Sequence, residues 1–142
     1  EDMLDVKLYE LSHEYFDKEG KDPFYSKANY GLTMAQGEYA GFFSGGDYYT
    51  KDYLQKMIDC LKRDDASFVY CNFKSHYGQN AECDAAIEQG HITSGSFIVR
   101  IPMVRKLKGF PINGMGDFQF ANEVKNKGYK MVKVEETLYV HK

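Results

Sequence analysis

Segments with helical and strand patterns alternate along the chain, and this alternation limits the fold more than any other feature of the sequence. The run ASFVYCNF over residues 66–73 is apolar on both faces, as is typical of a parallel-sheet strand covered by helices. Further strands are expected over residues 5–11, 38–43 and 95–100, and one or two over 129–141. Strands that alternate with helices build one layered sheet. The sequence therefore predicts a single α/β domain over residues 1–142, with a mostly parallel sheet and helices on both faces.

Helix starts and stops support this reading. Asp22-Pro23 is a good helix start, because Asp caps the first turn and proline fits the first helical position. Thr50 is expected to cap the next helix, and Asp117 to open the last one. The expected helices span residues 23–35, 50–63, 102–106 and 117–127. The second helix should have an apolar face formed by Tyr53, Leu54, Met57, Ile58 and Leu61. The polar residues 74–90 are expected to form a loop.

Charge and cysteine content exclude several classes of protein. The net charge is -3, without the concentrated basic face that nucleic-acid binding requires, so no nucleic-acid partner is expected. No apolar run approaches the ~20 residues of a membrane span. Cys60, Cys71 and Cys83 are irregularly spaced and indicate reduced thiols rather than a zinc site or disulfides. The expected location is the cytoplasm, either free or peripheral to a membrane.

The clearest functional signal is a spaced string, Asn29-x-Gly31-x-x-x-Ala35-x-Gly37-Glu38-Tyr39, which leads through Phe42-Phe43 into an acidic turn. SGGDYYTKDYLQKMIDCL, ASFVYCNF, SFIVR, KGF and GDFQFANEVKNKGYK follow in order. Over roughly residues 24–142 this order resembles glycosyltransferase family 2. The resemblance implies a glycosyltransferase A-type fold. It also implies transfer of a sugar from a nucleotide-diphosphate sugar to a hydroxyl of a glycan, lipid or protein acceptor, with inversion, as in polysaccharide biosynthesis.

The acidic turn departs from the family pattern. Members normally carry Asp-x-Asp-Asp where this chain has Ser44-Gly45-Gly46-Asp47. By resemblance, Asp47 would bind the diphosphate and its divalent cation, Mn²⁺ or Mg²⁺, with His141 after the last strand as a second metal ligand. The alternatives are a turn aspartate that accepts backbone N–H groups and a terminal surface histidine.

The start of the last helix departs as well. The family usually has Glu-Asp where this chain has Gly116-Asp117. By resemblance Asp117 would be the general base that takes the proton from the acceptor hydroxyl. Alternatively, Asp117 caps the helix by accepting N–H groups of its first turn.

Weaker candidates come from the same resemblance. Lys27 and Asn29 would approach the donor diphosphate, although the usual Arg before the Asn is Ala28 here. Tyr48 and Tyr49 either stack on a sugar or pack on the next helix. His76 and His91 flank the polar loop and either contact an acceptor or are solvated.

The strand-helix-strand unit that begins family members is not found in the sequence. The chain is therefore expected to be a partial domain, truncated at its N-terminus. Three explanations are open: a longer chain was trimmed, a second copy or companion subunit supplies the unit, or the chain is a reduced relative with another function. The altered turn leaves two functions open, a glycosyltransferase and a non-catalytic binding or assembly module.

Overall fold

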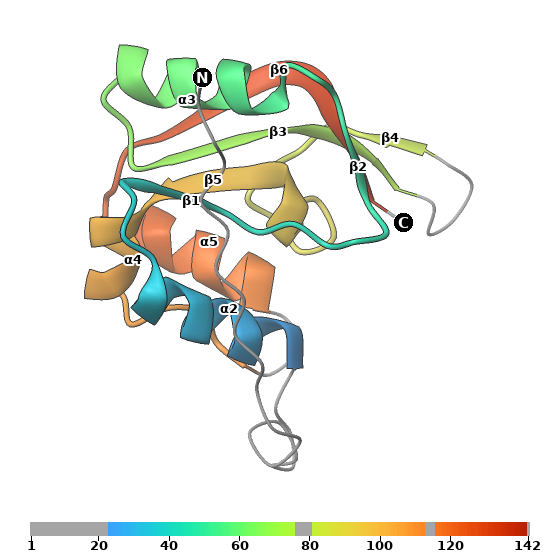
Figure 1. Cartoon of the computed structure of the whole chain (residues 1–142). Coiled ribbons are helices and arrows are strands. Elements are labelled where there is room, and N and C mark those ends of the chain that lie inside the picture. Colours follow the sequence, from blue (N-terminus) through green and yellow to red (C-terminus); the bar gives the residue numbers. More distant parts are fainter. Residues whose placement is uncertain (1–22, 76–80, 113–115, 142) are drawn as a thin grey trace, which may run out of the picture.

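The structure, a computed structural model, describes residues 23–75, 81–112 and 116–141. The strand predicted over residues 5–11 lies outside the described residues. In chain order the described elements are α2 (Pro23–Met34), β1 (Tyr39–Gly41), β2 (Tyr48–Tyr49), α3 (Tyr53–Arg63), β3 (Phe68–Ser75), β4 (Ala81–Cys83), the 3-10 turn η1 (Ser94–Ser96), β5 (Phe97–Arg100), α4 (Ile101–Lys106), α5 (Gly116–Asn126) and β6 (Met131–His141) (Figure 1).

The strands form one mixed sheet in the order β1-β5-β3-β6-β2, and β4 pairs with β3 beside this path. Among the described pairs β3–β6 is parallel, whereas β1–β5, β3–β5, β3–β4 and β2–β6 are antiparallel. The α/β class is confirmed, but the prediction of a mostly parallel sheet is wrong for the described strands. Parallel neighbours need a crossover, usually a helix. The stretch from β4 to β5 contains only the three-residue η1, so β5 returns antiparallel to β3.

Helices cover both faces of the sheet, as predicted. Helix α3 lies on one face and α2, α4 and α5 lie on the other (Figure 1). The α3 side has a core that includes Tyr53, Met57, Leu61, Val69 and Tyr139. The opposite side is rich in phenylalanine, with Phe68, Phe97, Phe110 and Phe120 packed together. Full burial of each such side chain contributes ~1.5–3 kcal/mol, so each core fixes the helices above it.

Helix α3 shows how spacing sets the buried face. Tyr53, Met57 and Leu61 recur every four residues and are at most 1% exposed, as the helical period requires. Leu54, predicted on the same face, is instead 55% exposed, because adjacent residues lie about 100° apart around a helix. The helix begins at Tyr53, three residues after the predicted cap Thr50, and Asp52 occupies the N-cap position. The Thr50 carbonyl oxygen is 3.2 Å from the Tyr53 nitrogen.

The turn after β1 brings distant segments together at one edge of the sheet. The Asp47 N–H donates to the Ser44 carbonyl oxygen at 3.1 Å, and the chain then enters β2. Strand β2 pairs with the end of β6, Tyr48 opposite Val140 and Tyr49 opposite Tyr139. Because β3 and β6 are parallel, their carboxyl ends meet at this edge, where ligands bind in α/β sheets.

In the part of the chain that the structure describes, every helix falls short of the length and apolarity needed to cross a bilayer.

Candidate active site

Asp47, Tyr139 and His141 form a hydrogen-bonded cluster at this edge. The Tyr139 hydroxyl donates to Asp47 Oδ2 at 2.5 Å and lies 2.9 Å from His141 Nδ1. His141 Nδ1 is also 3.6 Å from Asp47 Oδ1, and the Asp47 side chain is only 6% exposed. Burial, and next the hydrogen bond with Asp47, raise the pKa of Tyr139 far above its usual range. The phenol therefore keeps its proton at neutral pH.

Asp117 lies on the same cavity as His141. The cavity has a volume of about 490 Å³, and its lining also includes Phe73, Asp84, His91 and Thr93. Asp47 is not one of the lining residues, but it lies 3.6 Å from His141, which is. The structure thus brings Asp47, Asp117 and His141, three of the residues predicted from sequence, to one edge of the sheet.

Asp117 is half-buried in the first turn of α5. Its Oδ1 accepts the N–H of Phe118 at 2.7 Å, so it does bond to the first turn. The helix already begins at Gly116, however, one residue before the predicted cap. Burial raises the pKa of Asp117, opposed by hydrogen bonds from Phe118 and Tyr25 and by the nearby His141. A carboxylate with a raised pKa is a stronger base than an exposed one. Capping and proton transfer are therefore compatible at this residue.

Packing explains why glycine precedes Asp117. A Cβ at Gly116 would lie 2.5 Å from the Pro111 carbonyl oxygen and 2.9 Å from the Tyr25 ring. The glutamate that the family usually has here would not fit. The glycines of the acidic turn are different, since a Cβ at Gly45 or Gly46 would meet no atom within 4 Å.

Tyr49 and Tyr48 follow the turn but differ in their surroundings. The Tyr49 ring stacks on Tyr139 at 4.9 Å and packs edge-on against Tyr53 of α3 at 4.9 Å. This matches the alternative in which it packs on the next helix. Burial, followed by the charge of Asp47, raises the pKa of Tyr49. Tyr48 is 58% exposed on the edge strand β2.

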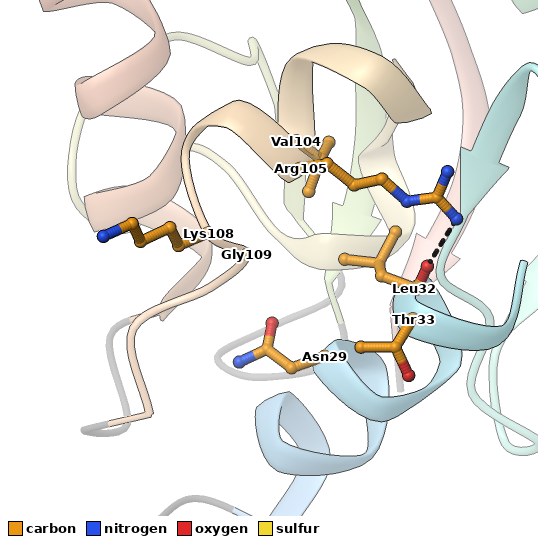
Figure 2. A pocket seen from close by; sticks show the side chains of 7 residues that line it. All are labelled: Asn29, Leu32, Thr33, Val104, Arg105, Lys108 and Gly109. Atoms are coloured by element: carbon orange, nitrogen blue, oxygen red, sulfur yellow. Dashed lines mark hydrogen bonds between the residues drawn. The ribbon is translucent and has the colours of Figure 1, made fainter.

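Lys27 and Asn29 lie on α2. The Asn29 amide binds the backbone of Phe110 in both directions, with Nδ2 2.8 Å from the carbonyl oxygen and Oδ1 2.7 Å from the nitrogen. Asn29 lines a second cavity, of about 400 Å³, together with Leu32, Thr33, Val104, Arg105, Lys108 and Gly109 (Figure 2). Its polar atoms hold the turn at Gly109, which has a φ of +82°. Lys27 is exposed, and neither residue lines the cavity of Asp117.

The Asp47–His141 pair fits part of a divalent-cation shell. A buried carboxylate oxygen and an imidazole nitrogen 3.6 Å apart are suitable donors. Within the described residues there is no group of three or more His, Cys, Asp or Glu side chains that could hold a metal ion by themselves. Mg²⁺ commonly takes one or two carboxylates and completes its shell with substrate phosphates and water. The pair therefore fits a cation that arrives with a diphosphate.

Tyr139 is the site residue that sequence reasoning missed. Its signal was its position two residues before His141 in a strand, which places both side chains on one face. Among the histidines, His91 lines the cavity and its Nδ1 is 3.8 Å from the Cys83 sulfur. His76 lies outside the described residues.

Comparisons with known proteins agree with this fold. The model of the family described as "Glycosyl transferase family 2" matches residues 11–121, which is well over half of the chain. No curated protein matches the chain. Solved structures of TarS from S. aureus superpose on it. The fragment 1-349 with UDP-GlcNAc gives a TM-score of 0.65 at 14% identity, covering 87% of this chain and 40% of that one. TarS itself gives 0.67 at 16%, covering 88% and 25%.

The same fragment with UDP gives a TM-score of 0.64 at 14% identity, with 84% of this chain and 39% of that one covered. The chain therefore spans less than half of these solved chains. At such identities the likeness shows the fold alone, which is that of glycosyltransferases of the A type. The family match carries the assignment further: the chain belongs to glycosyl transferase family 2.

Proposed function

We propose that this domain transfers a sugar from a nucleotide-diphosphate sugar to an acceptor hydroxyl, with inversion at the anomeric carbon. One observation carries the proposal: Asp117 and His141 line one cavity, and His141 contacts Asp47. The carboxylate expected on the acceptor side therefore lines the same cavity as the histidine that contacts the carboxylate expected on the diphosphate side. Two of the TarS structures contain UDP-GlcNAc or UDP, which supports a uridine diphosphate sugar as the donor class.

Asp117 is the proposed general base. The acceptor oxygen forms a bond to the anomeric carbon while the bond from that carbon to the diphosphate oxygen breaks. The acceptor proton passes to the Asp117 carboxylate. Attack opposite to the leaving group inverts the configuration. The half-buried position and raised pKa of Asp117 suit proton transfer to this carboxylate.

Asp47 and His141 are the proposed ligands of a divalent cation, manganese or magnesium. When bound, such a cation stabilises the negative charge that develops on the leaving diphosphate. The residues themselves supply one buried carboxylate oxygen and one imidazole nitrogen. Tyr48, exposed beside Asp47, is the proposed sugar contact. The predicted contacts of Lys27 and Asn29 with the diphosphate, and of Tyr49 with the sugar, remain predictions.

A second function is favoured by the acidic turn. Where the family carries its first two motif carboxylates, this chain has Ser44 and Gly46, and a side chain would fit at position 46. A non-catalytic module that binds a nucleotide sugar or assists assembly would tolerate this loss. The two functions differ in a measurable way. The enzyme turns over its donor and needs Asp117 to do so, whereas the module shows no turnover at all.

The deciding experiment is titration with UDP and UDP-sugars, with Mn²⁺ and with EDTA, followed by assay of sugar transfer or donor hydrolysis. Mn²⁺-dependent binding that Asp47→Asn weakens would support the proposed site. Binding without turnover, insensitive to Asp117→Asn, would favour the non-catalytic module. Absence of nucleotide binding under both conditions would refute the transferase and the nucleotide-sugar-binding module, and would leave only a role in assembly.

We also propose a second copy or a companion subunit as partner, in a cytoplasmic setting. In the described part of the sheet β1 is an edge strand that pairs only with β5, and such edges attract further strands. All three cysteines are free thiols, as in a reducing compartment. Sedimentation of the chain tests the partner: a stable monomer would contradict it.

The acceptor and a role in polysaccharide synthesis remain proposals that acceptor screening would test.

A further inference from the structure

The hydroxyl of Tyr139 stands between the two proposed cation ligands. It is 2.5 Å from Asp47 Oδ2 and 2.9 Å from His141 Nδ1. Its ring is 1% exposed, and Asp47 is 92 positions away in the chain. Tyr139 therefore joins the turn after β1 to the end of β6 at the point where the proposed ligands meet.

The chemistry of the three groups fixes the direction of these hydrogen bonds. A phenol has one proton to donate, and an ionised carboxylate only accepts. The Tyr139 hydroxyl therefore donates its hydrogen bond to Asp47, and Oδ2 is the oxygen that accepts it. The phenol oxygen can then accept hydrogen bonds, from His141 Nδ1 and from the Thr93 hydroxyl. Asp47 Oδ1 remains on the side of the imidazole, 3.6 Å from Nδ1.

The fold provides a specific place for this ring. A Cβ at Gly95 would lie 2.3 Å from Tyr139 Cζ and 2.5 Å from its hydroxyl oxygen, so only glycine leaves the space. The Tyr53 hydroxyl donates to the Gly95 carbonyl oxygen at 2.7 Å, which holds that segment. Tyr49 stacks on the other part of the ring at 4.9 Å. The hydroxyl is thus held in place before any ligand arrives.

We propose that Tyr139 is a positioning residue for the cation site: it binds one oxygen of Asp47 and so directs the other toward His141. The inference rests on the proposed function, because it concerns the same cation and diphosphate. Tyr139 acts through Asp47 and does not itself touch the substrate. With its proton on Nε2, His141 would offer Nδ1 to a cation and Asp47 would offer Oδ1, while Oδ2 keeps its bond from Tyr139. Without the hydroxyl the carboxylate loses its fixed orientation.

The test compares two tyrosines that make buried hydrogen bonds in the same cluster. Tyr139→Phe removes the bond to Asp47, whereas Tyr53→Phe removes the bond to the Gly95 carbonyl oxygen. UDP is titrated into wild type and both variants, with Mn²⁺ and with EDTA, and melting temperatures are recorded. Loss of an outer partner of a metal ligand costs ~10–100-fold in metal affinity. Tyr139→Phe should therefore weaken Mn²⁺-dependent UDP binding by at least about 10-fold. Tyr53→Phe, which keeps the bond from Tyr139 to Asp47, should weaken it much less.

The outcomes separate the inference from the proposed function. Equal Mn²⁺-dependent binding by wild type and Tyr139→Phe overturns the role of Tyr139 and leaves the cation site standing. Absence of Mn²⁺-dependent binding in wild type overturns the cation site and the inference together. Equal weakening in Tyr139→Phe and Tyr53→Phe shows general loosening and also overturns it. If Tyr139→Phe does not fold, Gly95→Ala takes its place. The added methyl group pushes the Tyr139 ring away from Asp47 without removing its hydroxyl, and the same loss of Mn²⁺-dependent UDP binding is expected.

Discussion

The acidic turn and the start of α5 each contain a glycine where the family has a carboxylate, and the structure gives the two glycines opposite meanings. At Gly46 an added Cβ meets no atom within 4 Å, whereas at Gly116 it meets the Pro111 oxygen at 2.5 Å and the Tyr25 ring at 2.9 Å. The first glycine is a substitution that the fold does not require. The second is required by packing. The turn therefore has room for the carboxylate that the family carries there, while the glycine at α5 belongs to the way this chain packs.

The largest effect should come from Gly116→Glu. The new side chain must displace Pro111 or Tyr25 and enters a buried position, so we expect a loss of about 3 kcal/mol or more in the free energy of unfolding. Gly45→Glu is the matched control, and it should change stability by less than ~0.5 kcal/mol. Chemical denaturation of both variants measures the difference. Similar stability of the two variants would remove the distinction between the glycines.

Asp117→Asn should have the next largest effect, on turnover. The amide keeps the size of the side chain and much of its capping ability but is not a useful base. If the domain is active, turnover should fall by on the order of 100-fold, with little change in UDP affinity. Rates and affinities measured together check this. Near-normal turnover with a lower melting temperature would make Asp117 a helix cap only.

Gly46→Asp should sharpen the comparison from the other side. A second carboxylate next to Asp47 adds a hard oxygen ligand, so Mn²⁺-dependent UDP binding should strengthen, by roughly 5- to 10-fold. Gly46→Asn, of the same size but uncharged, is the control and should gain less. Calorimetric titration measures both. If Gly46→Asp binds no better than wild type, the turn does not face the cation.

The smallest effect concerns pH. Burial holds the pKa of Asp117 above its usual value, so the folded chain binds this proton more tightly than the unfolded chain does. The stability that this proton contributes is complete below the unfolded pKa of ~3.9 and is lost as pH rises through the folded pKa. Lowering the pH from 7 toward 4 should therefore shift the melting temperature of wild type upward relative to Asp117→Asn. A difference that does not change with pH would contradict the burial of this carboxyl.

Local patterns predicted most helices because their causes are local. Asp22-Pro23 preceded a helix observed at Pro23–Met34, and the periodic Tyr53, Met57 and Leu61 gave the buried face of α3. Strand direction was not predictable in this way. A strand with two apolar faces, such as residues 66–73, needs cover on both sides, and it receives that cover in a mixed sheet as well as in a parallel one.

The candidate site was only partly accessible from sequence for a similar reason. Asp47, Asp117 and His141 were reached through motif order, which sequence retains. Tyr139 was missed because its partner lies 92 positions away and the two-residue strand β2 has no period to detect. Asn29 carried part of the family string, yet its amide binds the Phe110 backbone. A motif alone does not distinguish a residue that contacts a ligand from one that hydrogen-bonds a turn of the same chain.

Gly95 bears on how such a domain diverges. A single methyl group at this position would collide with the Tyr139 ring and its hydroxyl, although residue 95 itself contributes no polar side chain to the site. A relative could therefore keep every polar residue of the cluster and still lose their arrangement through one neutral-looking replacement. In a lineage where the site no longer matters, position 95 should drift freely. Among related chains, a glycine there paired with a tyrosine at position 139 would mark those still selected for the arrangement.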